Sequence, residues 1–123
     1  MGNILLVEDN EADADIVRQH LSTSIGSANL LRAYSLQEAI LISNSEKCDA
    51  VLLDLTLPDS DGLDTLRQYV AKTQNQTILV LTGISSEAIG LEAVKLGAQD
   101  YLIKGKFEGE LLFKAMQFAK ERK

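Results

Sequence analysis

Short apolar runs alternate with amphipathic helical patterns five times along this chain, and this alternation restricts the possible folds more than any other feature of the sequence. A run of four or five apolar residues bounded by polar ones is typical of a strand that is buried on both faces of a parallel sheet. The predicted strands are Asn3–Val7, Asn29–Ala33, Ala50–Asp54, Thr77–Thr82 and Asp100–Ile103. The pattern therefore predicts an α/β protein with a doubly wound parallel sheet and helices on both of its faces.

Signals for helix ends lie between these runs. Asn10 can cap a first helix, and Ser35 with Glu38 forms a capping box for a second. Gly97 can end the fourth helix, and a last helix is predicted from about Gly109. The side chains predicted to face the sheet are Ala14, Val17 and Leu21 in the first helix, Leu63, Leu66 and Val70 in the third, and Ile89, Ala93 and Leu96 in the fourth.

Polar residues stand where the predicted strands end. They are Glu8 and Asp9 after the first strand, Asp54 in the third, Thr82 in the fourth and Lys104 after the fifth. Because parallel strands end at one edge of a sheet, we expect these side chains to meet there. Three carboxylates at one place repel one another unless a cation neutralises them, and no His or Cys accompanies them to favour zinc. Hard oxygen ligands predict Mg²⁺, with Mn²⁺ as an alternative ion.

Composition restricts the compartment and the partners. The 123 residues suit one domain spanning positions 1–123, with no output domain within it. A net charge of -6 predicts repulsion from nucleic acids and anionic membranes. The single cysteine, Cys48, cannot form an internal disulfide, and no signal peptide or membrane-spanning run is present, so we expect a cytoplasmic protein.

The order and spacing of several of these residues resemble the sequence pattern of one known family, the CheY-like receiver domains of two-component response regulators. The residues that carry the resemblance are Glu8-Asp9, Asp54, Pro58, Gly62, Thr82, Gly97-Ala98 and Tyr101-Leu-Ile-Lys104. The resemblance covers nearly the whole chain. It implies a flavodoxin-like (βα)5 fold with the strand order 2-1-3-4-5.

The resemblance also implies roles for individual residues. Asp54 is expected to accept a phosphoryl group from a histidine kinase, a phosphotransfer protein or a small phosphodonor. Glu8, Asp9, Asp54 and the backbone carbonyl of Thr56 are expected to hold the Mg²⁺. Lys104 and Thr82 are expected to contact the phosphoryl group.

The same resemblance implies a switch. Tyr101 is expected to change rotamer as Thr82 moves, and the face formed by the fourth helix, the fifth strand and the fifth helix would then bind a downstream target or a second copy of the chain. The fourth helix also carries Leu91 and Val94 outside its predicted inward stripe, which suggests a docking surface. The chain would catalyse its own phosphorylation and dephosphorylation, without turning over an external substrate.

Some positions depart from the family pattern. Gly105 follows Lys104 where the family often has proline, and Gly83 follows Thr82 where alanine is common. Thr56 and Ile84, which flank the phosphoryl position in the family, offer no acid or amide to orient an attacking water. We therefore expect the phosphorylated form to lose its phosphate slowly, over many minutes rather than seconds.

The sequence leaves three other functions as alternatives. A haloacid-dehalogenase-like phosphatase would need an acid two residues after the nucleophile, where this chain has Thr56. A flavodoxin-like flavin carrier would need a phosphate cradle after the first strand, where this chain has acidic residues. A degenerate receiver could act only by docking. Taken singly, Lys104 could be a surface charge, Thr82 a buried strand residue and Tyr101 a core aromatic.

Overall fold

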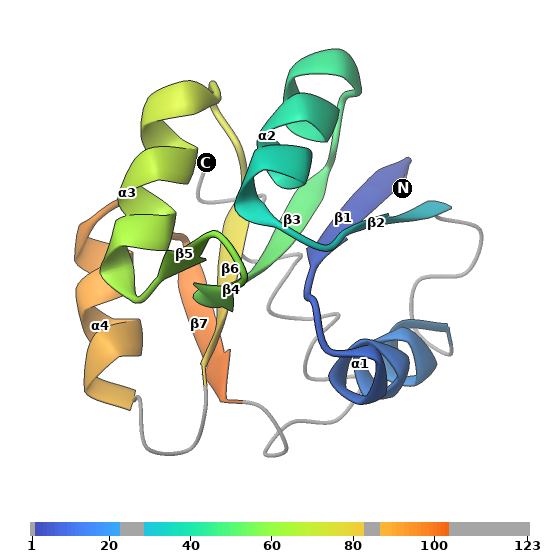
Figure 1. Ribbon diagram of the computed structural model, residues 1–123, viewed down its shortest axis with the longest axis horizontal. Helices are drawn as coiled ribbons and strands as arrows, with labels where there is room; N and C mark the ends of the chain where they lie inside the picture. Colours follow the sequence, from blue (N-terminus) through green and yellow to red (C-terminus); the bar gives the residue numbers. More distant parts are fainter. Residues whose placement is uncertain (1, 23–28, 83–86, 104–123) are drawn as a thin grey trace.

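Five parallel strands form one sheet in the spatial order β2-β1-β3-β6-β7 (Figure 1). The computed structural model describes residues 2–22, 29–82 and 87–103. The strands are β1 (Asn3–Val7), β2 (Asn29–Ala33), β3 (Ala50–Asp54), β6 (Ile78–Thr82) and β7 (Asp100–Ile103). This confirms the predicted fold class and strand order, since β6 and β7 are the fourth and fifth strands of the prediction. The fourth strand begins at Ile78, one residue later than predicted, although the carbonyl of Thr77 still accepts a hydrogen bond from the Val51 N–H at 2.8 Å.

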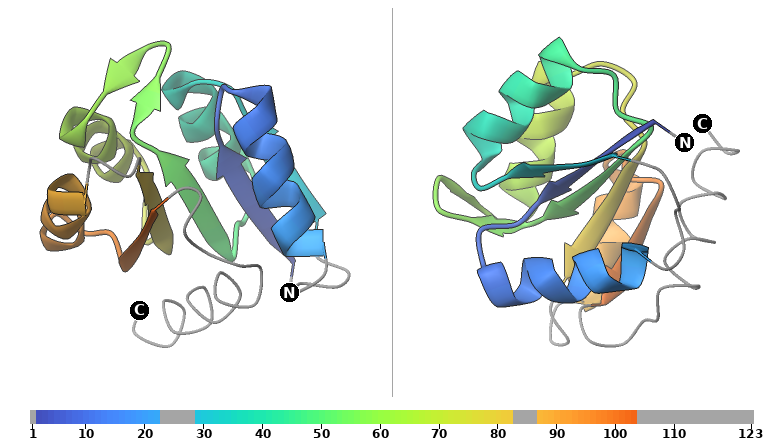
Figure 2. Two further views of the ribbon diagram at one scale, coloured as in Figure 1. Left: turned by 90° about the horizontal axis from the view of Figure 1, so that it is seen from below. Right: turned by 90° about the vertical axis from the view of Figure 1, so that its right-hand side faces the viewer.

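The helices cover both faces of this sheet (Figure 2). Helix α1 (Glu11–Ser22) packs on one face, and α2 (Leu36–Ser45), α3 (Leu63–Lys72) and α4 (Glu87–Lys95) pack on the other. None of the helices in the described part of the chain is long and apolar enough to cross a membrane. The last helix predicted, from about Gly109, lies outside the described residues.

Each strand contributes to two separate apolar cores. In β1, Ile4 and Leu6 join the core beneath α1, while Leu5 and Val7 join the core beneath α2, α3 and α4. Successive side chains of a strand point to opposite faces, so a strand covered on both sides must be apolar at every position. This accounts for the unbroken apolar runs in the sequence.

The helix N-termini are capped largely as predicted. The side chain of Asn10 accepts a hydrogen bond from the Asp13 N–H at 3.0 Å, and that of Ser35 accepts one from the Glu38 N–H at 3.1 Å. The Glu38 carboxylate reaches one residue beyond the capping-box position and accepts from the Tyr34 N–H at 2.6 Å. The effect is the same, because the carboxylate satisfies a donor just ahead of the helix.

The predicted inner face of α3 was wrong at Val70, which is 40% exposed. Leu66 and Tyr69 are fully buried instead, and Leu63 is half-buried. The large Tyr69 side chain belongs to the core beneath α2, α3 and α4, and its hydroxyl bonds that of Ser43 in α2 at 2.6 Å. A buried tyrosine with a partner for its hydroxyl can serve as a core residue, which a count of apolar residues overlooks.

The predicted inner face of α4 was also wrong in part. Ala93 is buried, but Ile89 and Leu96 are 37% and 36% exposed. The helix turns Gly90 and Ala93 inward because the Tyr101 ring of β7 lies against it, so closely that a Cβ at Gly90 would collide with the ring. An aromatic ring from the neighbouring strand therefore replaces the larger aliphatic residues that were expected inside.

Gly97 ends α4 as predicted. Its φ is +124°, a conformation that favours glycine. The Ala98 N–H bonds the Ala93 carbonyl at 3.1 Å, and the Gly97 N–H bonds the Val94 carbonyl at 3.2 Å. This pair of bonds is the Schellman arrangement.

The buried Tyr69 hydroxyl predicts how stability depends on alkaline pH. Burial raises the pKa of Tyr69 to about 12, from an ordinary value of about 10. Between these two values the unfolded state releases the tyrosine proton while the folded state keeps it. Stability should therefore hold up to about pH 10 and fall as the pH rises further toward 12. Urea unfolding of the wild type and of Tyr69→Phe at increasing pH measures the difference.

Tyr69→Phe should lose about 1 kcal/mol at neutral pH, because the Ser43 hydroxyl loses its buried partner, and its stability should fall less above pH 10 than that of the wild type. Tyr34→Phe is the matched control, since Tyr34 is 47% exposed. Equal alkaline losses in the wild type and in Tyr69→Phe would contradict this account.

Candidate functional site

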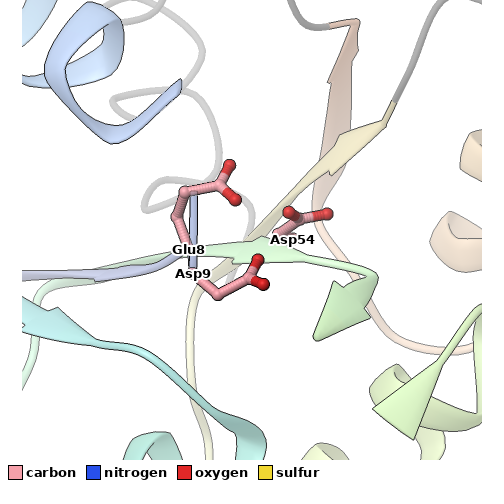
Figure 3. A group of neighbouring side chains, drawn as sticks. All are labelled: Glu8, Asp9 and Asp54. Atoms are coloured by element: carbon pink, nitrogen blue, oxygen red, sulfur yellow. The ribbon is translucent and has the colours of Figure 1, made fainter. Parts of the chain in front are cut away.

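Three carboxylates meet at the C-terminal edge of the sheet. Glu8 and Asp9 follow β1, and Asp54 ends β3, the strand paired beside it. Ligand oxygens from these three side chains lie within 4.8 Å of one another (Figure 3). The register that pairs Val7 with Leu53 puts Glu8 and Asp54 next to each other at the strand ends. The structure thus brings together the three acids expected to meet there.

Burial makes this grouping costly. Glu8 is fully buried and Asp54 is 7% exposed, whereas Asp9 is exposed to solvent. Two like charges about 4 Å apart repel by about 4 kcal/mol at an effective dielectric constant of about 20. Within the described ranges the group contains only carboxylates, with no imidazole or thiolate. A donor set of hard oxygens, open to solvent on the Asp9 side, fits Mg²⁺ or Mn²⁺.

Backbone contacts hold the acid-bearing segments in place. The Glu8 N–H donates to the Ala33 carbonyl at 3.0 Å, extending the β1–β2 pairing by one residue. The Asn10 N–H donates to Glu8 Oε2 at 3.3 Å, and the Thr56 N–H donates to Asp54 Oδ1 at 3.1 Å. The last two bonds each fix the direction of a carboxylate, and in both the donor is the backbone N–H two positions further along the chain.

A small hairpin that was not predicted follows Asp54. Its strands β4 (Thr56–Leu57) and β5 (Ser60–Asp61) pair antiparallel. The Thr56 hydroxyl donates to Asp61 Oδ1 at 3.3 Å across the hairpin. The Thr65 hydroxyl of α3 donates to the Leu55 carbonyl at 2.8 Å. The loop after Asp54 is thus held by its own hairpin and by α3.

Asp59, at the tip of this hairpin, is a long-range helix cap. Its carboxylate accepts hydrogen bonds from the N–H groups of Leu36 at 2.8 Å and Gln37 at 3.0 Å, in the first turn of α2. Desolvation raises the pKa of Asp59, but the N–H groups of Gln37 and Leu36 outweigh it and hold the pKa below its ordinary value. Sequence reasoning missed this contact, because no local pattern indicates that position 59 caps a helix that begins at position 36.

The remaining predicted site residues belong to β6, β7 and the segment that follows. Thr82 ends β6, the strand next to β3, and its backbone pairs with Ile103. Tyr101 is half-buried in β7 and packs against the core beneath α2, α3 and α4. The side chain of Thr82, together with Gly83, Ile84, Lys104 and Gly105, lies outside what the structure describes. The roles of Thr82 and Lys104 therefore stay predictions.

Comparison with known proteins decides the family. The family model for the response regulator receiver domain matches residues 4–117. This chain belongs to that family. It is therefore a receiver domain of the two-component type, with the sheet edge described above as its acidic site.

Individual relatives agree with this assignment. The chain is 34% identical to the KDP operon transcriptional regulatory protein KdpE of Escherichia coli, over 90% of this chain and 48% of KdpE. It is 28% identical to the chemotaxis protein CheY of Thermotoga maritima, over 85% of this chain and 87% of CheY. The receiver domain of NtrX from Brucella abortus shares the fold, with a TM-score of 0.84 at 24% identity over 98% and 99% of the two chains. The receiver domain thus spans about half of KdpE and most of CheY.

The carboxylate cluster predicts how Mg²⁺ affects stability. In the absence of Mg²⁺, Asp9→Asn should unfold at a higher temperature than the wild type, because it removes one of three repelling charges. Mg²⁺ at about one hundred times its Kd should stabilise the wild type by about 2.7 kcal/mol. The same Mg²⁺ concentration should stabilise Asp9→Asn much less, because this variant lacks one of the proposed ligands.

Thermal unfolding with and without Mg²⁺ measures both effects. Asp15→Asn is the control, since Asp15 is an exposed acid of α1 paired with Arg18. An Asp9→Asn variant that Mg²⁺ stabilises as much as the wild type would rule out Asp9 as a ligand.

Proposed function

We propose that Asp54 of this receiver domain accepts a phosphoryl group from a phosphohistidine on a sensor histidine kinase or a phosphotransfer protein, or from a small phosphodonor. The observation that carries the proposal is the convergence of Glu8, Asp9 and Asp54 within 4.8 Å at the end of two adjacent strands. Such a cluster combines a carboxylate nucleophile with ligands for a divalent cation.

In the proposed reaction, a carboxylate oxygen of Asp54 attacks the phosphorus atom. An O–P bond forms, the N–P bond of the phosphohistidine breaks, and the imidazole nitrogen keeps the electron pair and takes up a proton. The Thr56 N–H orients Asp54 through its bond to Oδ1. Glu8, Asp9, Asp54 and the Thr56 carbonyl would hold Mg²⁺. When bound, the ion supplies positive charge against the repulsion between the carboxylate and the phosphoryl oxygens.

In the proposed signal, Thr82 and Lys104 contact the phosphoryl group and Tyr101 changes rotamer. Two observations support an output surface on α4 and β7. The Tyr101 ring lies against Gly90 of α4, so a movement of the ring changes the packing of that helix. Helix α4 also exposes apolar side chains, with Leu91 at 54% and Val94 at 38%. The partner that binds this output surface would be a downstream protein, an output domain or a second copy of the chain.

Three observations weigh against other functions. The position two residues after Asp54 is Thr56, so the general acid of a haloacid-dehalogenase-like phosphatase is lacking there. A domain that acted only by docking would have no use for buried Glu8 and Asp54 side by side, because their repulsion destabilises the fold. The net charge of -6 also disfavours direct binding to nucleic acid.

Labelling with a small phosphodonor tests the proposal. With Mg²⁺ and acetyl phosphate or phosphoramidate, the protein should gain the mass of one phosphoryl group, and peptide mapping should locate it on Asp54. Asp54→Asn should take up no label at that position, because an amide is a poor nucleophile. Asp64→Asn, which changes an exposed acid of α3, should label like the wild type. Equal labelling of Asp54→Asn and the wild type would refute the assignment.

The residues flanking the site predict a slow loss of phosphate. Thr56 has an exposed side chain that bonds Asp61, and it supplies no acid or amide for a water molecule. Once the donor is removed, the labelled protein should keep its phosphate for minutes, and Thr56→Glu should shorten that lifetime several-fold. Release of inorganic phosphate over time measures both. A wild-type lifetime of seconds with no phosphatase present would contradict the prediction.

A further inference from the structure

Arg32 of β2 makes a paired contact with the acidic site that the functional assignment does not use. Its Nε and Nη2 atoms donate to the backbone carbonyl oxygen of Glu8 at 2.9 Å and 2.6 Å. The Arg32 side chain is only 12% exposed. The carbonyl in question belongs to the peptide group that joins Glu8 to Asp9.

Two further contacts fix the guanidinium group. Nη2 lies 3.2 Å from Glu11 Oε1, in the first turn of α1. The guanidinium carbon lies 4.2 Å from the centre of the Tyr34 ring, a cation–π distance. Arginine suits this place because its planar group can donate two bonds to one oxygen while stacking on an aromatic ring. The guanidinium thus joins β2, the β1–α1 connection and the start of α1.

We propose that Arg32 is a positioning residue for the metal site, an inference that rests on the proposed function of the carboxylate cluster. Two of the three carboxylates, those of Glu8 and Asp9, extend from the two ends of the peptide group that Arg32 holds. The orientation of this peptide group sets the directions in which both side chains leave the backbone. Arg32 thus keeps their oxygens close to Asp54 despite the repulsion among the acids.

The direction in which the Mg²⁺ affinity changes when Arg32 is replaced distinguishes a positioning role from a purely electrostatic one. Arg32 carries a positive charge next to acidic ligands, so removing that charge should by electrostatics alone attract Mg²⁺ more strongly. Loss of positioning has the opposite effect, because carboxylates that are free to move apart bind the ion more weakly. Residues that orient metal ligands typically affect affinity by 10- to 100-fold.

Calorimetric titration with Mg²⁺ of the wild type, Arg32→Gln, Arg32→Lys and Arg18→Gln tests the proposal. Arg18→Gln is the matched control, because it removes the same charge from an exposed side chain of α1 that bonds Asp15. Circular dichroism establishes that each variant is folded at the temperature of the titration.

We expect the Kd for Mg²⁺ to rise roughly tenfold in Arg32→Gln and by less in Arg32→Lys, which can still donate one bond to the Glu8 carbonyl. Arg18→Gln should stay within about twofold of the wild type, as expected for an exposed ion pair. Binding to Arg32→Gln that is as tight as to the wild type, or tighter, would overturn the proposal.

If Arg32→Gln does not fold, the Kd of Arg32→Lys for Mg²⁺ tests the proposal instead. A Kd raised at least threefold supports positioning, and an unchanged Kd refutes it. A wild-type protein that binds no Mg²⁺ would instead count against the proposed function, so the two failures can be told apart.

Discussion

The repulsion among Glu8, Asp9 and Asp54 is the constraint around which the site is built. Three carboxylates within 4.8 Å, two of them buried, oppose folding unless other interactions hold them together. Pairing of β1 with β3, each packed into both apolar cores, fixes the strand ends that carry these acids. Hydrogen bonds to backbone atoms on either side of the acids then limit how far each side chain can move.

These restraints come from separate parts of the chain. Arg32 of β2 holds the peptide group between Glu8 and Asp9, and Thr65 of α3 holds the Leu55 carbonyl directly after Asp54. Asp59 ties the hairpin after Asp54 to the start of α2. A chemical change at Asp54 therefore acts on a loop that is bonded to two helices. On the other side of β3, β6 and β7 connect the same sheet edge to α4 through Tyr101 and Gly90.

The sheet and the acid cluster could be predicted because both follow from local sequence. Four of the five strands have the predicted bounds, since an apolar run with a polar stop defines a buried strand on its own. The meeting of Glu8, Asp9 and Asp54 follows from parallel topology, which puts all strand C-termini at one edge.

What could not be predicted depends on contacts between distant residues. The β4–β5 hairpin has strands of two residues, too short to show any periodicity. Val70 and Ile89 lie on apolar stripes yet are exposed, because the Tyr69 and Tyr101 rings fill the interior positions. Arg32 and Asp59 reach backbone groups 24 and 23 positions away in sequence, and no local pattern encodes such partners.

Anomalous diffraction from crystals soaked in Mn²⁺ tests the central claim most directly. The account predicts a single strong peak within bonding distance of carboxylate oxygens of Glu8, Asp9 and Asp54, and loss of that peak in crystals of Asp54→Asn. A peak elsewhere on the molecule, or none under conditions where Mn²⁺ binds in solution, would contradict it.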